Sequence, residues 1–119
     1  MDDAVRHALA TDRTVDITTI GRRSGTPRRI ETWLYRAGDR FYLTGLPGPR
    51  SWYANVTATP ELTLHLKQSV KADLPATARA ITDDAERREV IRAIIAELDG
   101  DRDYDAWVAG SPRAEITFA

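Results

Sequence analysis

Residues 18–29 bring together residue types that bind anions. Four arginines stand in this segment, at Arg22, Arg23, Arg28 and Arg29. Gly21 and Gly25 permit positive φ and a close approach of the backbone to a ligand, and Pro27 fixes φ as the chain leaves the turn. The backbone N–H groups of residues 22–26 and the guanidinium forks would form a concave donor surface for phosphate or carboxylate. A solvated hairpin loop whose arginines serve solubility is the alternative interpretation.

A second group of residues could enclose a flat ring system. The glycine- and proline-rich stretch 45–50 is predicted to be a loop, and it ends in Arg50, a further anion-binding candidate. Aromatic residues that could wall a ring are Trp52, Tyr53, Tyr104 and Trp107. For each of them alone, packing in the core is the other common role of such a side chain.

Other kinds of chemistry find little support in the sequence. The chain has no cysteine, and its two histidines, His7 and His65, are too far apart in sequence to form a metal-ligand motif. No spacing suggests a Ser/His/Asp triad, and no glycine-rich nucleotide fingerprint is present. His65 stands among alternating leucines, which favours a hydrogen-bonded structural histidine. If the protein is an enzyme, a cofactor is therefore expected to carry the chemistry.

Composition and length predict a single domain over residues 1–119. The formal net charge of −1 argues against a nucleic-acid partner, and the absence of a long apolar run argues against a membrane span, so a cytoplasmic protein is expected. The charge is unevenly distributed. Residues 1–60 hold nine arginines against six acids, whereas residues 61–119 hold eight basic residues against twelve acids. Positive charge is therefore concentrated in the first half of the sequence.

Apolar periodicity predicts six short strands and one long helix. The strands are expected near residues 13–20, 28–36, 41–44, 62–67, 70–81 and 116–118. In the second strand both faces carry sizeable side chains, which suggests one face buried in the core and the other lining a groove or an interface. Pro75 indicates an edge or a bulge. This pattern favours a mainly β, α+β fold, a small antiparallel barrel with peripheral helices.

The helices are predicted from their capping residues. Asp2 or Asp3 can cap a short N-terminal helix, and Ser51 can cap a segment over 52–58 that ends before Pro60. The long helix should begin with a capping box at Asp83, three residues before a glutamate. It should end at residue 100, a glycine, and be followed by an acidic linker over 99–105.

Two motifs make the chain resemble the deazaflavin-dependent nitroreductase family, whose members are also described as F-420-dependent quinone reductases. The first is the run Gly-Arg-Arg-Ser-Gly-Thr-Pro-Arg over residues 21–28, and the second is Trp-Tyr-Ala-Asn over residues 52–55. An Ala-Arg pair at 78–79 precedes the capped helix. The resemblance covers roughly residues 14–110, and the two motifs are more specific as a pair than either is alone.

The resemblance implies a split β-barrel of the FMN-binding type that binds coenzyme F-420, a deazaflavin with a phosphate and an oligoglutamate tail. It further implies hydride transfer to a quinone, a nitroaromatic compound or an activated alkene. By the same resemblance, the phosphate and tail would be held by Arg22, Arg23, Ser24 and Gly25, with Pro27 and Arg28 shaping the turn. Trp52 and Asn55 would sit near the ring. Tyr104 would close over ring and substrate, and Tyr53 or Tyr104 would donate a proton to the reduced acceptor.

Two departures from the family pattern keep other functions open. The loop before Trp52 is short, and Arg50 stands where a lysine is usual, although a planar guanidinium meets a phosphate differently from an ammonium. The step over residues 57–60 also lacks its usual cation. FMN is therefore the alternative cofactor, in an FMN-dependent reductase. A non-catalytic carrier of a flavin-like, lipid or tetrapyrrole ligand is the alternative function. A further possibility is a homodimer that buries Trp33 and Tyr35 between subunits.

Overall fold

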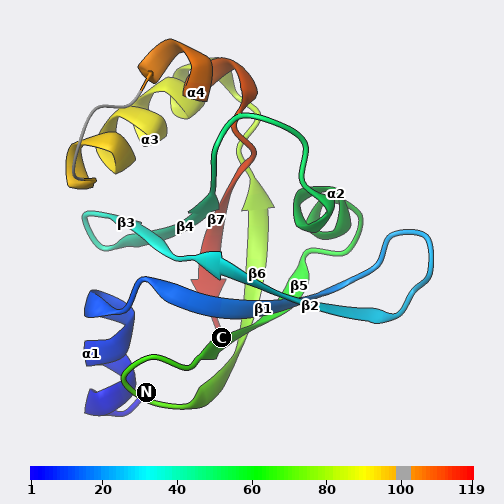
Figure 1. The fold of residues 1–119 in the computed structure, drawn as a ribbon, viewed down its shortest axis with the longest axis vertical. Helices are drawn as coiled ribbons and strands as arrows, with labels where there is room; N and C mark the ends of the chain where they lie inside the picture. The colour runs from blue at the N-terminus through cyan, green and yellow to red at the C-terminus, as the bar shows by residue number, and fades with distance from the viewer. Residues whose placement is uncertain (99–102) are drawn as a thin grey trace.

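The computed structural model describes residues 1–98 and 103–119, and over these ranges the chain forms seven strands and four helices. Figure 1 shows α3 and α4 packed together at one end of the sheet and α1 at the other. In chain order the elements are α1 (Asp3–Thr11), β1 (Thr14–Ile20), β2 (Pro27–Trp33), β3 (Tyr35–Ala37), β4 (Arg40–Thr44), α2 (Ser51–Ala58), β5 (Glu61–Leu66), β6 (Ala72–Ala80), α3 (Asp84–Glu97), α4 (Tyr104–Gly110) and β7 (Arg113–Phe118).

The seven strands form one antiparallel sheet in the order β2-β1-β5-β6-β7-β4-β3. The sequence-based prediction of a single strand over residues 28–36 is wrong. The strand is interrupted at Leu34, whose side chain is fully buried and whose N–H donates to the carbonyl of Arg13 at 2.8 Å, and pairing passes there from β1 to β4. As a result β2 and β3 lie at opposite edges of the sheet, and the sheet curls into the half-barrel of the split-barrel fold (Figure 1).

Alternating apolar residues place the core on the inner side of this curl. Val15 and Ile17 on β1 are fully buried, and so is Leu64 on β5, to which Ile17 is directly paired. The strand β2 departs from this rule, because it is an edge strand and most of its residues are exposed on both faces. The expectation that one of its faces is buried is therefore not met, and Ile30 remains 41% exposed.

Aspartates begin three of the helices, as the sequence predicts for two of them. Asp2 accepts a hydrogen bond from the N–H of Val5 at 2.8 Å, and Asp83 accepts one from the N–H of Glu86 at 2.9 Å. The third is Asp103, at the start of α4. The fourth helix differs from the prediction. Ser51 is the first helical residue of α2 and not its cap, and the cap position is taken by Arg50, without a side-chain hydrogen bond.

The remaining local predictions have mixed outcomes. Pro75 lies on β6, an interior strand, one residue before the β7 register begins, and its carbonyl accepts the N–H of Ala119 at 3.1 Å, so the predicted edge is not found there. The helix α2 ends before Pro60, as expected. The predicted helix end at residue 100 lies outside the described residues, as does most of the acidic linker over 99–105. In the described parts of the chain, no helix has the length and apolarity to cross a membrane.

Candidate functional site

The arginine turn and the start of α2 enclose a pocket of about 460 Å³. Its cationic lining residues are Arg22, Arg23, Arg28 and Arg50. No carboxylate among the described residues lines it, so the four guanidinium groups are not neutralised within the pocket. Thr19, Ser24, Trp52 and Asn55 also line it. We call this the first pocket. It joins two segments that the sequence separates by more than twenty residues, the β1–β2 turn and the N-terminal part of α2 (Figure 1).

The turn between β1 and β2 is fixed by its own hydrogen bonds. The N–H of Gly21 donates to the Thr26 carbonyl at 2.9 Å, and the N–H of Gly25 donates to the Gly21 carbonyl at 2.8 Å. Gly25 has a φ of 69°, a left-handed conformation that favours glycine. At Gly21 a Cβ atom would lie 2.5 Å from the Ser24 hydroxyl, so this position admits no side chain unless Ser24 moves. Both glycines are therefore required by the shape of the turn.

The predicted role of the backbone amides has to be corrected. Three of the five N–H groups over residues 22–26 are engaged inside the protein: that of Arg22 donates to Asn55, that of Gly25 to Gly21, and that of Thr26 to the Ser24 hydroxyl. These three amides are therefore not available to a ligand. An anion in the first pocket would be met by the guanidinium side chains.

Asn55 connects the turn to α2. Its Oδ1 accepts a hydrogen bond from the N–H of Arg22 at 3.1 Å, and its Nδ2 donates to the hydroxyl of Thr19 at 3.0 Å. Only 5% of the residue is exposed. Although Asn55 lines the first pocket, its polar atoms are committed to the protein, so its contribution is to hold the turn against the helix.

The other predicted site residues do not all line the first pocket. Gly25 and Pro27 shape the turn but do not line the first pocket, whereas Ser24 does. Arg29, the fourth arginine of the turn segment, points elsewhere and donates to Asp16 at 3.1 Å. Arg50 donates to the carbonyls of Pro49 and Leu46 at 2.9 and 3.0 Å, which folds its guanidinium back over its own loop.

The predicted aromatic wall is only partly assembled. Trp52 lines the first pocket, but it is 4% exposed and belongs mainly to the core. Tyr53 meets Trp52 edge to face, with centroids 5.8 Å apart, and lines a different pocket. Tyr104 reaches neither pocket, since its hydroxyl donates to the carbonyl of Arg88 at 3.3 Å and its ring lies under Arg92 on α3. Trp107 is a core residue.

A second pocket of about 520 Å³ lies on the other side of α2. It is bounded by the loop before α2, by the start of α3 and by the segment that joins α4 to β7. Its charged lining residues are Arg50, Arg87 and Arg113, and within the described ranges no carboxylate lines it. The sequence analysis missed Arg87 and Arg113. No local pattern marks them, because Arg87 looks like a helix surface residue and Arg113 starts an ordinary strand.

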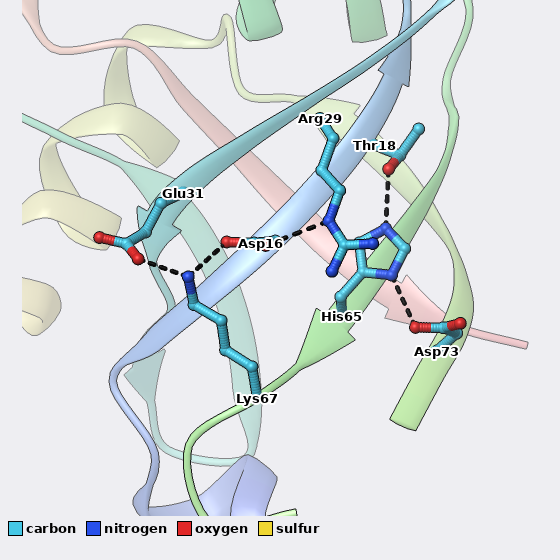
Figure 2. Close-up of polar contacts among 7 residues, drawn as sticks. All are labelled: Asp16, Thr18, Arg29, Glu31, His65, Lys67 and Asp73. Carbon is cyan, nitrogen blue, oxygen red and sulfur yellow. Dashed lines mark hydrogen bonds and ion pairs between the residues drawn. The ribbon is translucent and has the colours of Figure 1, made fainter. Parts of the chain in front are cut away.

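The outer face of the sheet carries a polar network apart from both pockets (Figure 2). His65 Nε2 lies 2.7 Å from the hydroxyl of Thr18, and His65 Nδ1 lies 2.7 Å from a carboxylate oxygen of Asp73. The prediction that His65 is hydrogen-bonded is confirmed. Beside it, hydrogen bonds from Lys67, opposed by partial burial and reinforced by Arg29, hold the pKa of Asp16 below its usual range.

Solved structures with the same architecture define the class of protein. An F-420 reductase matches all of this chain and 96% of its own chain, with a TM-score of 0.74 and 15% identity. A conserved hypothetical protein from Mycobacterium tuberculosis matches 99% of this chain and 81% of its own, with a TM-score of 0.75 and 14% identity. A protein of the pyridoxinephosphate oxidase family from Clostridium acetobutylicum matches 96% and 80%, with a TM-score of 0.66 and 11% identity. These proteins share the split-barrel fold.

The sequence also identifies the family. Residues 4–113 match the F-420H(2)-dependent quinone reductase family, so the chain belongs to that family and is an F-420-dependent oxidoreductase. The resemblance noted from the two sequence motifs is thereby confirmed. Of the cofactors considered from the sequence, the family assignment supports F-420 over FMN, and it supports an enzyme over a carrier.

Proposed function

We propose that this chain transfers a hydride from reduced F-420 to a small acceptor, a quinone, a nitroaromatic compound or an activated alkene, and that the first pocket holds the phosphate and acidic tail of the coenzyme. The observation that carries this proposal is the set of four arginines around a pocket that no carboxylate of the described residues lines. A polyanionic group is the natural complement of such a donor set, since each charge-assisted hydrogen bond is stronger than a neutral one. The residues present therefore fit the coenzyme.

Different residues of the turn have different parts in this proposal. Arg22, Arg23 and Arg28 bind phosphate or carboxylate oxygens through their side chains, and Arg50 adds a fourth charge from the opposite wall. The hydroxyl of Ser24 also faces the pocket, although it already contacts the Thr26 hydroxyl at 2.8 Å. Gly25 and Pro27 act by shaping the turn.

The protein's remaining task is to orient the reactants and exclude water. Bound F-420 in its reduced form supplies the hydride. Trp52 offers a rigid apolar surface at the pocket wall, and Asn55 keeps the arginine turn in register with it. A reduced quinone also needs a proton, and we do not assign its donor to Tyr53, because that residue lines the second pocket on the other side of α2. Tyr104 is left out of this role because it packs against α3.

The test is a titration of the purified chain with F-420, followed by tryptophan fluorescence. The double variant Arg22→Ala/Arg23→Ala should raise the Kd by about a hundredfold, roughly tenfold for each arginine that no longer donates a charge-assisted hydrogen bond. A matched control is Arg88→Ala, because Arg88 pairs with Asp84 on the surface of α3. Added salt should weaken binding to the wild-type chain. A double variant that binds F-420 as the wild type does would refute the assignment of the first pocket.

The acceptor is identified by turnover. Reduced F-420 is mixed with menadione, a nitroaromatic compound or cyclohexenone, and oxidation of the coenzyme is followed by its absorbance. FMN is titrated in parallel as the comparison cofactor. Oxidation that depends on the enzyme and on one of these acceptors supports the proposed reaction. Tight F-420 binding without oxidation by any of them would contradict the proposed acceptor classes and leave the coenzyme site standing.

We also propose a homodimer through the edge strand β2. Its outer edge has no strand partner among the described residues, and it carries Trp33, which is 46% exposed. A second copy of β2 would pair its backbone and cover the Trp33 side chain. The predicted interface needs one correction, because Tyr35 is 7% exposed and already packs within the chain against α3.

A further inference from the structure

The second pocket and the first pocket lie on opposite faces of α2. Trp52 and Asn55 line the first, whereas Tyr53 and Ala54 line the second, as the helical period of 3.6 residues requires. Arg50, at the start of the helix, borders both. The floor of the second pocket is formed by the segment from Gly110 to Arg113, which leaves α4 and enters β7. The proposed coenzyme site does not include this floor.

Two neighbouring guanidinium groups line the second pocket. Arg113 is 1% exposed, and its Nη2 donates to the carbonyls of Trp107 and Val108 at 2.7 and 2.9 Å. Arg87 Nη2 donates to the same Val108 carbonyl at 2.8 Å. Burial and then the neighbouring charge of Arg87 lower the pKa of Arg113 to about 10, so Arg113 remains charged at neutral pH. Over the described residues neither forms an ion pair with a carboxylate.

Unpartnered polar atoms concentrate in this pocket. Four buried side-chain nitrogen or oxygen atoms have no hydrogen-bond partner in the described parts of the chain, and three of them belong to residues that line the second pocket: Arg87 Nε, Ser111 Oγ and Arg113 Nη1. Buried donors are nearly always paired in folded proteins, so such a cluster calls for a partner that the chain does not supply. Two of the three atoms belong to cationic donors, for which an anionic oxygen is the strongest hydrogen-bond partner.

The walls above these groups are largely apolar. Ile81, Pro49 and Pro112 line them together with the ring of Tyr53. We propose that the second pocket binds a small organic anion, with its carboxylate or phosphate head at Arg87 and Arg113 and a compact apolar body against Tyr53 and Pro112. This site is independent of the coenzyme proposed for the first pocket. An inorganic ion alone would leave the apolar walls unused.

The experiment uses the full chain without coenzyme and three probes: benzoate, phenyl phosphate and the neutral analogue benzamide. Amide chemical shifts are followed by NMR during each titration. We expect saturable shifts at the amides of residues 53–54, 110–111 and 113 with one or both anions and none with benzamide. Saturation by benzoate alone would assign a carboxylate ligand, and saturation by phenyl phosphate alone a phosphate ligand. Higher salt should weaken the binding of either anion.

A pair of variants on neighbouring positions of α3 tests the charge. Arg87→Gln should weaken binding of the anionic probe about tenfold or more, the effect expected from removing one charge-assisted hydrogen bond. Arg88→Gln should leave it within about twofold, because Arg88 pairs with Asp84 at 3.0 Å outside the pocket. Even if Arg87→Gln does not fold, the comparison of benzoate with benzamide on the wild-type chain shows whether binding requires an anionic ligand.

Three results would overturn the inference. The first is benzamide shifting the same amides as strongly as benzoate, and the second is equal weakening by Arg87→Gln and Arg88→Gln. The third is anion-induced shifts confined to residues 21–28, which would place the anion in the first pocket. Because no coenzyme is present, a negative outcome leaves the F-420 proposal unaffected. Failure of F-420 binding would likewise leave this site standing.

Discussion

Asn55 holds the backbone of Arg22: the amide oxygen on α2 accepts the N–H of the first arginine of the turn at 3.1 Å. The same side chain donates to Thr19 on β1 at 3.0 Å, and it is almost completely buried. These two hydrogen bonds fix the distance between α2 and the β1–β2 turn, which are far apart in sequence. The arginine side chains of the first pocket start from this anchored backbone, so their placement depends on a residue that need not touch a ligand.

Replacing Asn55 by alanine should therefore weaken both the fold and the binding of F-420. The N–H of Arg22 and the buried hydroxyl of Thr19 would each lose a partner, which corresponds to about 1–3 kcal/mol of unfolding free energy. We expect the Kd for F-420 to rise about tenfold because the arginines are no longer held in place. Urea unfolding and the fluorescence titration measure the two effects.

Thr57→Ala is the control for Asn55→Ala. Thr57 lies on the same helix, is exposed, and donates only to the carbonyl of Tyr53 at 2.8 Å. Its replacement should change neither quantity appreciably. If Asn55→Ala binds F-420 as well as the control does, Asn55 has no positioning role.

The two glycines of the turn should respond differently to substitution. Gly25→Ala meets no neighbouring atom within 4 Å, so its cost comes from the φ of 69° and should be about 1–2 kcal/mol. Gly25→Asn should cost less, since asparagine tolerates this conformation. In Gly21→Ala the new Cβ would collide with Ser24 Oγ and displace that hydroxyl from the pocket wall.

The measurements for this comparison are thermal unfolding and F-420 affinity for the three variants. Gly25→Asn should bind nearly as the wild type does, and Gly21→Ala should bind clearly more weakly. An order of affinities in which Gly25→Asn is the weaker binder would contradict the description of the turn.

The position of the barrel's strands could be predicted in large part from sequence, because the pairs of alternating residues around Ile17 and Leu64 reflect a purely local pattern. The aspartate caps were predictable for the same reason. The interruption at Leu34 was not, since the residues before and after it alternate in the sequence and only the curl of the whole sheet places β2 and β3 at opposite edges. Which strand forms an edge depends on pairing between segments that are far apart in sequence.

In the candidate site, too, local sequence features were predictable and tertiary contacts were not. The arginine turn was predictable because its glycines and arginines are contiguous, and Arg22, Arg23 and Arg28 do line one pocket. The orientation of Tyr104 depends on how α4 packs on α3, which no local pattern encodes. The meeting of Arg87 with Arg113 is a tertiary contact between α3 and β7, so it also escapes sequence analysis.

The network around Asp16 predicts how stability depends on pH. Hydrogen bonds from Lys67 and Arg29 lower the folded-state pKa of Asp16 below 3.8, while the unfolded chain keeps an ordinary value (Figure 2). The stabilisation is therefore present above the unfolded-state pKa and is lost as the pH falls through the folded-state pKa. Asp16→Asn should be less stable than the wild type at pH 7, with a difference that shrinks below about pH 4.

This difference is measured by urea unfolding of both proteins at a series of pH values from about 2.5 to about 7. Asp3→Asn is a suitable control, because Asp3 is exposed and faces only Arg6 at 3.7 Å. A stability difference between Asp16→Asn and wild type that grows as the pH falls would have the wrong sign and would exclude the paired carboxylate as its cause.

The proposed pairing of β2 predicts that the oligomeric state depends on Trp33. The wild-type chain of 13.3 kDa should sediment as a dimer, and Trp33→Glu should sediment as a monomer because a charge would be buried opposite a second copy. Leu46→Glu is the control, since Leu46 is 64% exposed and lies on the loop before α2. It should leave the dimer intact. A wild-type chain that stays monomeric at millimolar concentration would exclude the β2 dimer, and dissociation by Leu46→Glu alone would move the interface to the loop beside the first pocket.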